Sequence, residues 1–556
     1  MLSSDRNLAP IAPNLDLGAE SALAGPFGAR RIVYADFTAS GRSLPAIEQA
    51  IREHVLPTYG NTHTDASHTG ATTTRLREEA RAAIRRGVNA GDEHAVIFTG
   101  SGTTAAVNKL VAMLGLAGPS GDRDRELLRA AVPPAERPVV FVGPFEHHSN
   151  ELPWREALAT VVRLPLDEAG HICLGSLAAA LADHAGRPHR YVAISAASNV
   201  TGVITETAAV AHVAHKYGAR IFVDYAAGGP YLPIDMRGTG QGDHLDAVYF
   251  SPHKFLGGPG ASGVLVCDRT LHRIARPTMP GGGTVRYVSA TQQHYLADVE
   301  LIEEAGTPAI IGDIRAGLVV QLKSDIGADA IRAAEHSAVA RAFRRWGSEP
   351  AIEILGPLTA TRLPIFSFNI TSGGRVLHHN FVVRLLNDLF GIQARGGCSC
   401  AGPYGHELLH IGETQSAMYR DLIDQGHELF KPGWVRVGLH FSMSAATQAY
   451  ILDAVAFIAR HGAAFLGAYT PDLHSGLWSA STPRPAAGAE SWDRLCAWRG
   501  PSAPLPDTEA PDFAACLRRA EDLAATVARS PAPASPIPGA LEPQRWFRMR
   551  GDRDDP

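Results

Sequence analysis

The chain of 556 residues is poor in lysine and cysteine and has no long apolar run. Only five of its 51 basic residues are lysines. Six cysteines in so long a chain do not form a disulfide framework, which excludes a small secreted scaffold and favours a reducing cytoplasm. No stretch approaches 18 uninterrupted apolar residues, and the N-terminus has no apolar signal core, so we expect neither a membrane span nor export.

The chain also has no excess of positive charge. Its 51 basic and 56 acidic residues give a net charge of -5, which excludes the basic stripe that nucleic-acid binding requires. Hydrophobic residues make up 45% of the chain, enough for large cores. The length predicts two folded domains with accessory segments.

Short β-branched runs alternate with helical patterns between about residues 95 and 270. Several runs are continuously apolar, as in strands that are buried on both faces. The alternation predicts a mostly parallel, doubly wound sheet, which binds its ligand at the carboxyl ends of the strands. The predicted strands are 95–98, 139–142, 191–195, 220–224, 247–250 and 263–266.

The pattern changes beyond about residue 320 and again near residue 467. We expect an N-terminal segment (1–50), a large domain (51–320), a small α+β domain (321–466) and a Pro/Trp-rich extension (467–556). The extension either anchors onto the body through its tryptophans or is a disordered linker with a short helix. Its tryptophans are Trp478, Trp492, Trp498 and Trp546.

Polar residues with complementary chemistry follow the predicted strands. A Gly/Thr turn, "TGSGTT", opens a helix and suits a phosphate. A histidine pair follows the next strand in "EHHSN". Asp224 ends a buried strand, where a carboxylate needs a proton or a cation, and Lys254 follows in "SPHK". A phosphate cradle, a flat imidazole, a buried carboxylate and a lysine together match pyridoxal phosphate, which forms a Schiff base with lysine.

Several longer stretches carry a family resemblance. They are "EHHSNELPW", "SNVTGVITE", "VDYAAGGPYLPIDM", "FSPHKFLGGPGASGVLV", "PGGGTV", "EEAGTPAIIGDIRAGL" and "ARGGCSCAGP". In this order they resemble the class V aminotransferase superfamily, and within it the cysteine desulfurase and selenocysteine lyase branch. The resemblance runs from about residue 34 to residue 442. It implies an α/β enzyme of the fold type I pyridoxal-phosphate class, with a large, mostly parallel sheet domain and a smaller α+β domain.

The resemblance implies roles for twelve residues. Lys254 would hold the cofactor and shuttle the α-proton, Asp224 would keep the pyridine nitrogen protonated, and His147 would stack on the ring. Thr284 would reach the phosphate in a neighbouring subunit, which implies a homodimer. Arg436 and Arg395 would bind the substrate, a small amino acid, and Cys400 would be the nucleophile. The other cofactor-binding residues would be Thr103, Thr104, Asn199, Ser251 and His253.

The loop "RGGCSCAGP" matches the position of the desulfurase nucleophile at Cys400. Its thiolate would attack the sulfur of L-cysteine, retain it as a persulfide for a possible acceptor protein, and release alanine. Cys398 resembles the Cys-x-Cys loop of molybdenum-cofactor sulfurases; it either assists the persulfide or has no role.

Two departures from the family pattern leave the substrate open. Ala227 stands where the family has a glutamine or histidine, and the stretch 59–74 differs, although His63 or His68 would still be able to face the substrate. The alternatives are a selenocysteine lyase, a molybdenum-cofactor sulfurase-like enzyme, and a C–S lyase or epimerase on another amino acid. An alternative of another class is a non-catalytic protein with a structural zinc site at Cys398, Cys400, His406 and His410.

Overall fold

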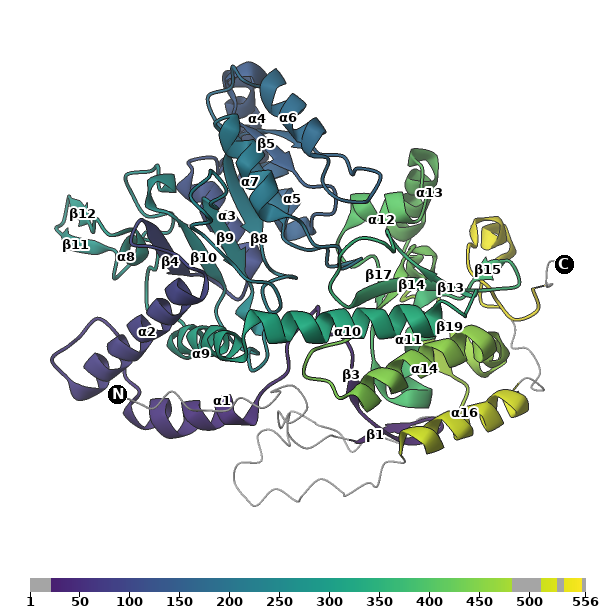
Figure 1. Ribbon diagram of the computed structural model, residues 1–556. Coiled ribbons are helices and arrows are strands. Elements are labelled where there is room, and N and C mark those ends of the chain that lie inside the picture. The colour runs from purple at the N-terminus through teal and green to yellow at the C-terminus, as the bar shows by residue number, and fades with distance from the viewer. Residues whose placement is uncertain (1–21, 483–511, 528–534, 553–556) are drawn as a thin grey trace.

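The computed structural model describes residues 22–482, 512–527 and 535–552 (Figure 1). Two sheets with their covering helices lie side by side: a large one built from residues 94–268, and a smaller one built from residues 352–438. The prediction of an α/β class with a large sheet is confirmed. The four segment limits given above stay predictions.

The large sheet has seven strands, and their order brings the carboxyl ends of β5, β7, β8 and β9 to one edge. These four pair in parallel with one another, whereas β10 runs antiparallel to both β4 and β9. The order is β4 (His94–Phe98), β10 (Val264–Asp268), β9 (Ala247–Phe250), β8 (Arg220–Asp224), β7 (Arg190–Ser195), β5 (Val139–Val142) and β6 (Thr160–Arg163).

Alternate residues of the large sheet face two different helix layers. Ala95 and Ile97 of β4 pack in the cluster that contains α3 (Thr103–Met113) and α5 (His148–Glu156). Val96 and Phe98 pack in the opposite cluster. Since both faces are apolar and covered, the strands read as continuous hydrophobic runs. The opposite layer contains α2 (His68–Gly87), α6 (Leu174–Asp183), α7 (Thr207–Lys216) and α9 (Ile310–Ile326).

Two details of the sheet were not predicted. Strand β6 was not predicted, because an edge strand is only half-buried and its residues "TVVR" do not form the long apolar run that marks a buried strand. The antiparallel direction of β10 was not predicted either, because the hydrophobic pattern of a strand does not indicate its direction in the sheet.

The smaller sheet is antiparallel in the order β13 (Ile352–Ile354), β14 (Ile365–Ser372), β18 (Trp434–Gly438) and β17 (Arg395–Gly397). Its core includes α10 (Ala328–Trp346), α11 (His379–Phe390) and α14 (Ala445–His461). Apart from α16 (Phe513–Val527) of the C-terminal extension, the remaining helices named in Figure 1 are α1 (Pro45–Ala50), α4 (Asp122–Ala131), α8 (Val299–Ile302), α12 (Gly402–Leu408) and α13 (Glu413–Asp424).

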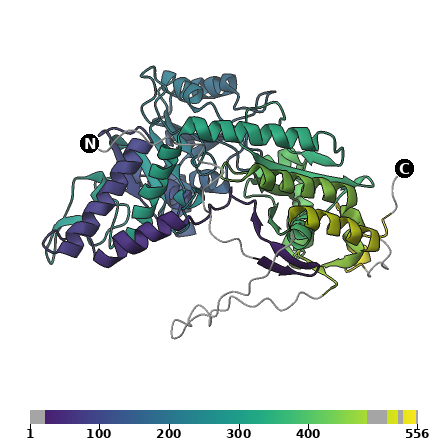
Figure 2. The ribbon, with the colours of Figure 1, turned by 60° about the horizontal axis from the view of Figure 1, so that its bottom comes forward.

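Both chain ends contribute to the smaller half. The hairpin of β1 (Ala22–Gly25) and β2 (Gly28–Arg31) lies beside its helices (Figure 2), and β3 (Val33–Tyr34) pairs with β16 (Ile392–Gln393). This path carries residues 36–41 across to the carboxyl edge of the large sheet, where Gly41 donates its backbone N–H to the carbonyl of His253.

The described parts of the C-terminal extension pack as core. Helix α16 (Phe513–Val527) buries Cys516 in the same cluster as α11 and α14. Trp478 is buried, and the indole N–H of Trp546 donates to the carbonyl of Phe430. Anchoring through these two tryptophans is confirmed; Trp492 and Trp498 lie outside the described residues.

One helical stretch of the described chain, Ala445–Ala468, is long and apolar enough to cross a membrane by length and composition. It begins with α14, and Ile451, Val455 and Ile458 of that helix are fully buried in the core of the smaller half. Its apolar character is therefore explained by core packing.

Candidate active site

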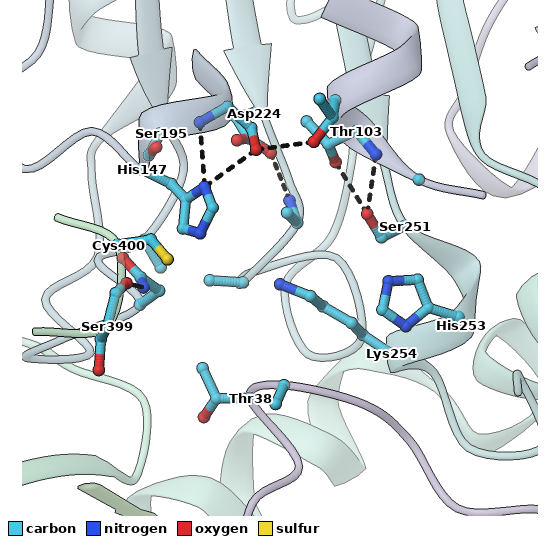
Figure 3. Close-up of a pocket in the computed structure, with 18 of the residues that line it drawn as sticks. Thr38, Thr103, His147, Ser195, Asp224, Ser251, His253, Lys254, Ser399 and Cys400 are labelled. Carbon is cyan, nitrogen blue, oxygen red and sulfur yellow. Dashed lines mark hydrogen bonds between the residues drawn. The ribbon is translucent and has the colours of Figure 1, made fainter. Parts of the chain in front are cut away.

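A cavity of about 350 Å³ opens at the carboxyl edge of the large sheet, against the smaller half (Figure 3). It is lined by residues that follow β4, β5, β7, β8 and β9, together with the loop after β17. Eleven of the twelve residues singled out in the sequence line it: Thr103, Thr104, His147, Asn199, Asp224, Ser251, His253, Lys254, Arg395, Cys400 and Arg436.

Lys254 and Asp224 are the charged pair on the sheet side of the cavity. Asp224 ends β8, and its Oδ1 accepts the backbone N–H of Ala226 at 2.7 Å. Burial raises the pKa of Asp224 to about 6, although Lys254 opposes the shift. Burial lowers the pKa of Lys254 to about 8, and the carboxylate again opposes it. The lysine therefore loses its proton far more readily than a solvated lysine.

An anion cradle lies where α3 begins. The backbone N–H of Thr103 donates to Ser251 Oγ at 2.9 Å, and the two hydroxyls lie 3.0 Å apart. A Cβ added to Gly102 would lie 2.8 Å from Ser251 Oγ, so this turn requires glycine. Backbone N–H groups and hydroxyls at a helix N-terminus are suited to a phosphate.

His147 connects β5 to the cavity as the N-terminal cap of α5. Its Nδ1 accepts the backbone N–H of Ser149 at 3.1 Å. Burial and the nearby Lys254 charge lower the pKa of His147 to about 4, which keeps the ring neutral. The preceding residue, Glu146, accepts the backbone N–H and the hydroxyl of Ser195 at 2.8 and 2.6 Å.

Glu146 is a structural residue that the sequence reasoning missed. It is fully buried, and burial raises its pKa to about 8. Its hydrogen bonds connect the segment after β5 to the end of β7 and so fix the position of the neighbouring His147. The first letter of "EHHSN" was the available signal.

Arg436 and Arg395 lie opposite each other on β18 and β17 and share one carboxylate. Asp36 Oδ1 lies 3.0 Å from Arg436 Nη2, and its Oδ2 lies 2.9 Å from Arg395 Nε. Arg436 is buried and also donates to the carbonyl of Asn199 at 3.1 Å. Asp36 was not singled out, although the stretch "YADFTASGR" that contains it marks the start of the family resemblance.

The cysteine loop is a strained turn that is stabilised by hydrogen bonds from residues outside the loop. Ser399 and Cys400 have φ of 51° and 54°, a left-handed conformation that non-glycine residues seldom adopt. Asn199 Nδ2 donates to the Ser399 carbonyl at 2.8 Å, and the backbone N–H of His148 donates to the Cys400 carbonyl at 2.9 Å. The side chain of Cys400 is exposed and lines the cavity.

Ala227 also lines the cavity and has no side-chain donor. Asn199, predicted as a cofactor-binding residue, gives one amide N–H to Ser399 and retains a second.

Among the twelve residues given roles by the resemblance, Thr284 alone does not line the cavity. Its hydroxyl donates to the carbonyl of Gly281 at 2.7 Å. His63 lies beside the same loop, since a Cβ added to Gly283 would be 3.0 Å from His63 Nε2. His63 and His68 are also absent from the cavity lining, so neither faces a substrate in this subunit's cavity.

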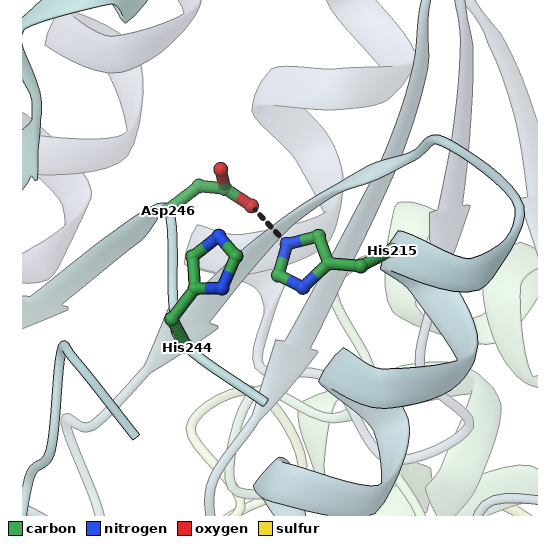
Figure 4. A group of neighbouring side chains, drawn as sticks. All are labelled: His215, His244 and Asp246. Carbon is green, nitrogen blue, oxygen red and sulfur yellow. Dashed lines mark hydrogen bonds and ion pairs between the residues drawn. The ribbon is translucent and has the colours of Figure 1, made fainter. Parts of the chain in front are cut away.

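The zinc alternative lacks a ligand set. Cys398, Cys400, His406 and His410 do not bring three ligand atoms together; among the described residues, the one such group is His215, His244 and Asp246 (Figure 4). In that group His215 Nε2 contacts Asp246 at 2.9 Å, and the Asp246 carboxylate also accepts the backbone N–H of Ile221. The group thus joins the starts of β8 and β9, at the opposite end of the strands from the cavity.

Comparison with known proteins agrees with this geometry. The model of the family described as aminotransferase class-V matches residues 33–446. A curated cysteine desulfurase of Dickeya dadantii is 31% identical over 376 residues, which cover 67% of this chain and 84% of the relative. A probable cysteine desulfurase of Halalkalibacterium halodurans is 30% identical over the same length and the same shares.

Solved structures show the same fold. The apo structure of a cysteine desulfurase from Thermococcus onnurineus NA1 aligns with a TM-score of 0.61 and 23% identity, over 77% of this chain and 95% of that one. The cysteine desulfurase CsdA of Escherichia coli aligns with a TM-score of 0.59 and 23% identity, over 76% and 93% of the two chains.

The chain belongs to the aminotransferase class-V family, whose members are pyridoxal-phosphate enzymes. Within this family its sequence is similar to that of cysteine desulfurases, and the resemblance described from the motifs is confirmed. The family match ends at residue 446, so the C-terminal extension lies outside it.

Proposed function

We propose that this protein is a pyridoxal phosphate-dependent cysteine desulfurase, which moves the sulfur of L-cysteine onto Cys400 and releases alanine. One observation carries the proposal: Lys254, Asp224 and Cys400 come from three separate elements and line a single cavity. A lysine and a carboxylate alone would fit many reactions of this family. The thiol opposite them favours sulfur transfer over an epimerase or a lyase that needs no cysteine.

The residues fit the cofactor. The Gly102 turn, the Thr103 N–H and the Ser251 hydroxyl would hold its phosphate, Asp224 would hold the proton on its pyridine nitrogen, and Lys254 would bind its aldehyde. When bound, pyridoxal phosphate supplies an electron sink for the substrate's α-carbon. His147 would lie against the ring as an uncharged imidazole, because its pKa of about 4 keeps it neutral at physiological pH.

Lys254 would also move a proton. With a pKa of about 8, its amine takes a proton from the α-carbon and returns one to the product at physiological pH. Arg436 would bind the substrate carboxylate through a bidentate contact. Asp36 fixes the direction of that guanidinium and compensates its buried charge.

Cys400 would be the nucleophile. Its thiolate attacks the sulfur of L-cysteine, and a new S–S bond forms as the substrate's C–S bond breaks. The three-carbon remainder takes up a proton and leaves as alanine, while the sulfur stays on Cys400. The exposed side chain would leave this sulfur accessible to a thiol acceptor.

A homodimer would complete the site. Thr284 lies next to β11 (Val285–Val288), where Tyr287 and Val288 are 61% and 58% exposed, and Met279 in the same region is 68% exposed. Large apolar side chains exposed together are typical of an interface. They would bring the loop that carries Thr284, together with the exposed His63, to the cavity of the other subunit; the Thr284 side chain itself is buried within its own subunit. The cysteines of the described residues form no disulfide, which supports a cytoplasmic location.

The direct test is incubation of the holoenzyme with a stoichiometric amount of L-cysteine and no other thiol, because the substrate is itself a thiol. We expect alanine to form, and peptide mass analysis to find an additional sulfur atom on the peptide that contains Cys400. The same incubation with L-serine, which lacks the sulfur, is the control. Alanine formation without sulfur on that peptide would contradict the role of Cys400.

Replacing Asp224 by asparagine should change stability and catalysis in opposite directions. The pKa of Asp224 is raised to about 6, so the cofactor-free protein loses stability as pH rises from about 4 to about 6 and the buried carboxyl ionises. Asp224→Asn should therefore raise the unfolding free energy of the cofactor-free protein at pH 8 by about 1–3 kcal/mol.

The same variant should form alanine about 10²- to 10³-fold more slowly, because a carboxamide does not hold the pyridine proton. Urea unfolding of the cofactor-free protein and the rate of alanine formation are the two measurements. Asp183→Asn, at the exposed end of α6 and outside the cavity lining, is the matched control and should change neither. Full activity of Asp224→Asn would remove Asp224 from the proposed site.

A further inference from the structure

His148 makes two hydrogen bonds to the backbone of the cysteine loop. Its own backbone N–H donates to the Cys400 carbonyl at 2.9 Å, and its imidazole Nε2 accepts the backbone N–H of Gly402 at 3.0 Å. His148 begins α5 at the carboxyl edge of the large sheet, whereas the loop follows β17 of the smaller half. The two bonds therefore join the two halves of the protein beside the proposed nucleophile.

The imidazole bond meets a specific need at the start of α12. The first N–H groups of a helix have no acceptor within the helix, and Gly402 is the first residue of α12. A Cβ added to Gly402 would lie 3.2 Å from His148 Nε2, so a glycine at this position leaves space for the close contact. The imidazole thus supplies the acceptor that the helix lacks.

The turn that precedes α12 depends on contacts of this kind. Cys400 has a φ of 54°, and a non-glycine residue keeps such a left-handed conformation only where its surroundings fix it. From the edge of the large sheet, Asn199 bonds the Ser399 carbonyl and His148 bonds both Cys400 and Gly402. His148 is therefore the residue with the larger share of these contacts.

The bond to Gly402 requires an uncharged imidazole. A backbone N–H is always a donor, so Nε2 must present its lone pair; an imidazolium carries a proton on both nitrogens and has no acceptor. Burial lowers the pKa of His148, while Glu151 opposes the shift and Arg155 adds to it. The ring therefore stays uncharged at physiological pH and is able to keep this bond.

We infer that His148 is a positioning residue for the nucleophile: its imidazole fixes the strained turn so that the Cys400 thiol faces the cavity. This inference rests on the proposed function. His148 does not line the cavity, so it would touch neither cofactor nor substrate. His147, the residue before it, would lie against the cofactor ring. Two adjacent residues would thus set the distance between that ring and the thiol.

The test compares two variants of His148 in the holoenzyme. His148→Ala removes the acceptor and keeps the backbone N–H; alanine formation from L-cysteine should fall about 10- to 100-fold, because a small displacement of a reacting group has an effect of this size. His148→Gln offers a carbonyl oxygen in place of Nε2 and should recover most of the lost rate. The cofactor absorption should be unchanged in both. His212→Ala, exposed on α7 and outside the cavity lining, is the matched control.

Two further readouts distinguish positioning from a loss of packing. Hydrogen exchange of the Gly402 amide should be faster in His148→Ala than in the unmodified protein and in His148→Gln. As pH falls through the pKa of His148, the activity of His148→Gln relative to the unmodified protein should rise, because glutamine does not take up a proton.

The groups around His148 that titrate or carry a charge are common to both proteins, so this ratio isolates His148. They are His147, Glu151, Arg155 and the Cys400 thiol.

Three results would overturn the inference. They are full activity of His148→Ala, no recovery of rate or amide protection in His148→Gln, and an activity ratio that stays constant with pH. Each is obtained with an active unmodified protein, so the proposed function would stand. The absence of alanine from the unmodified holoenzyme, with cofactor bound, refutes the proposed function and this inference together.

Discussion

The Lys254→Ala variant should form alanine from L-cysteine at least about 10³-fold more slowly than the unmodified protein, which places it at or below detection. Lys254 has two proposed tasks, to bind the cofactor aldehyde and to move the α-proton. Its amine faces the cavity next to Asp224, and no second lysine lines that cavity. Loss of this one amine therefore removes both tasks.

Three measurements test this expectation. The unmodified protein mixed with pyridoxal phosphate should absorb visible light, and borohydride reduction should fix a pyridoxyl group on the peptide containing Lys254; the variant should show neither. Lys216→Ala, at the exposed end of α7, is the control and should behave as the unmodified protein. A reduced adduct on another lysine, or activity of Lys254→Ala near that of the control, would contradict the assignment.

The large sheet and most of the cavity were predictable because the relevant signals are local. Each buried strand reads as an apolar run, and the residue that follows it lies at the carboxyl edge by the rule for parallel sheets. This is why Asp224 and Lys254, which follow neighbouring strands β8 and β9, were found together from the sequence. Cys400 was found through the motif of its loop and not through any pattern of secondary structure.

The missed residues act through contacts between distant segments. Asp36 fixes two arginines that lie 359 and 400 positions further along the chain. Glu146 is adjacent to His147, but Ser195, which donates two hydrogen bonds to it, is on β7. Periodicity gives no information on such pairings, because burial of a carboxylate depends on the tertiary environment.

The C-terminal extension is a second case in which sequence composition did not predict tertiary packing. Its Pro-rich composition was compatible with a disordered linker, yet α16 contributes buried residues to the core of the smaller half. Trp546 stacks on His379 with ring planes 9° apart, and a Cβ added to Gly396 would lie 3.0 Å from the His379 ring. Gly396 belongs to β17, which leads into the cysteine loop. The extension is therefore part of the packing that supports this loop.

The Cys400→Ala variant should lose alanine formation about 10³-fold or more while it still binds the cofactor and L-cysteine. The thiol is the one group of the cavity with the chemistry to accept a sulfur atom, whereas Lys254, Asp224 and Arg436 remain in place. Cys398 is not expected to replace it, since Cys398 lines a separate cavity beside α12 and Trp434, and the left-handed turn lies between the two cysteines.

The Cys400→Ala variant tests the nucleophile directly, because it should keep cofactor and substrate binding and lose only sulfur transfer. Adding L-cysteine to the cofactor-loaded variant should still change its visible spectrum, because the residues proposed to hold the cofactor and the substrate carboxylate are intact. No alanine and no protein-bound sulfur should follow. Cys173→Ala is the matched control and should keep full activity, since this cysteine lies at the start of α6, outside both cavities. Alanine formation by Cys400→Ala at the rate of that control would show that sulfur leaves without a cysteine nucleophile, and the reaction would then be that of a different class V enzyme acting through Lys254 alone.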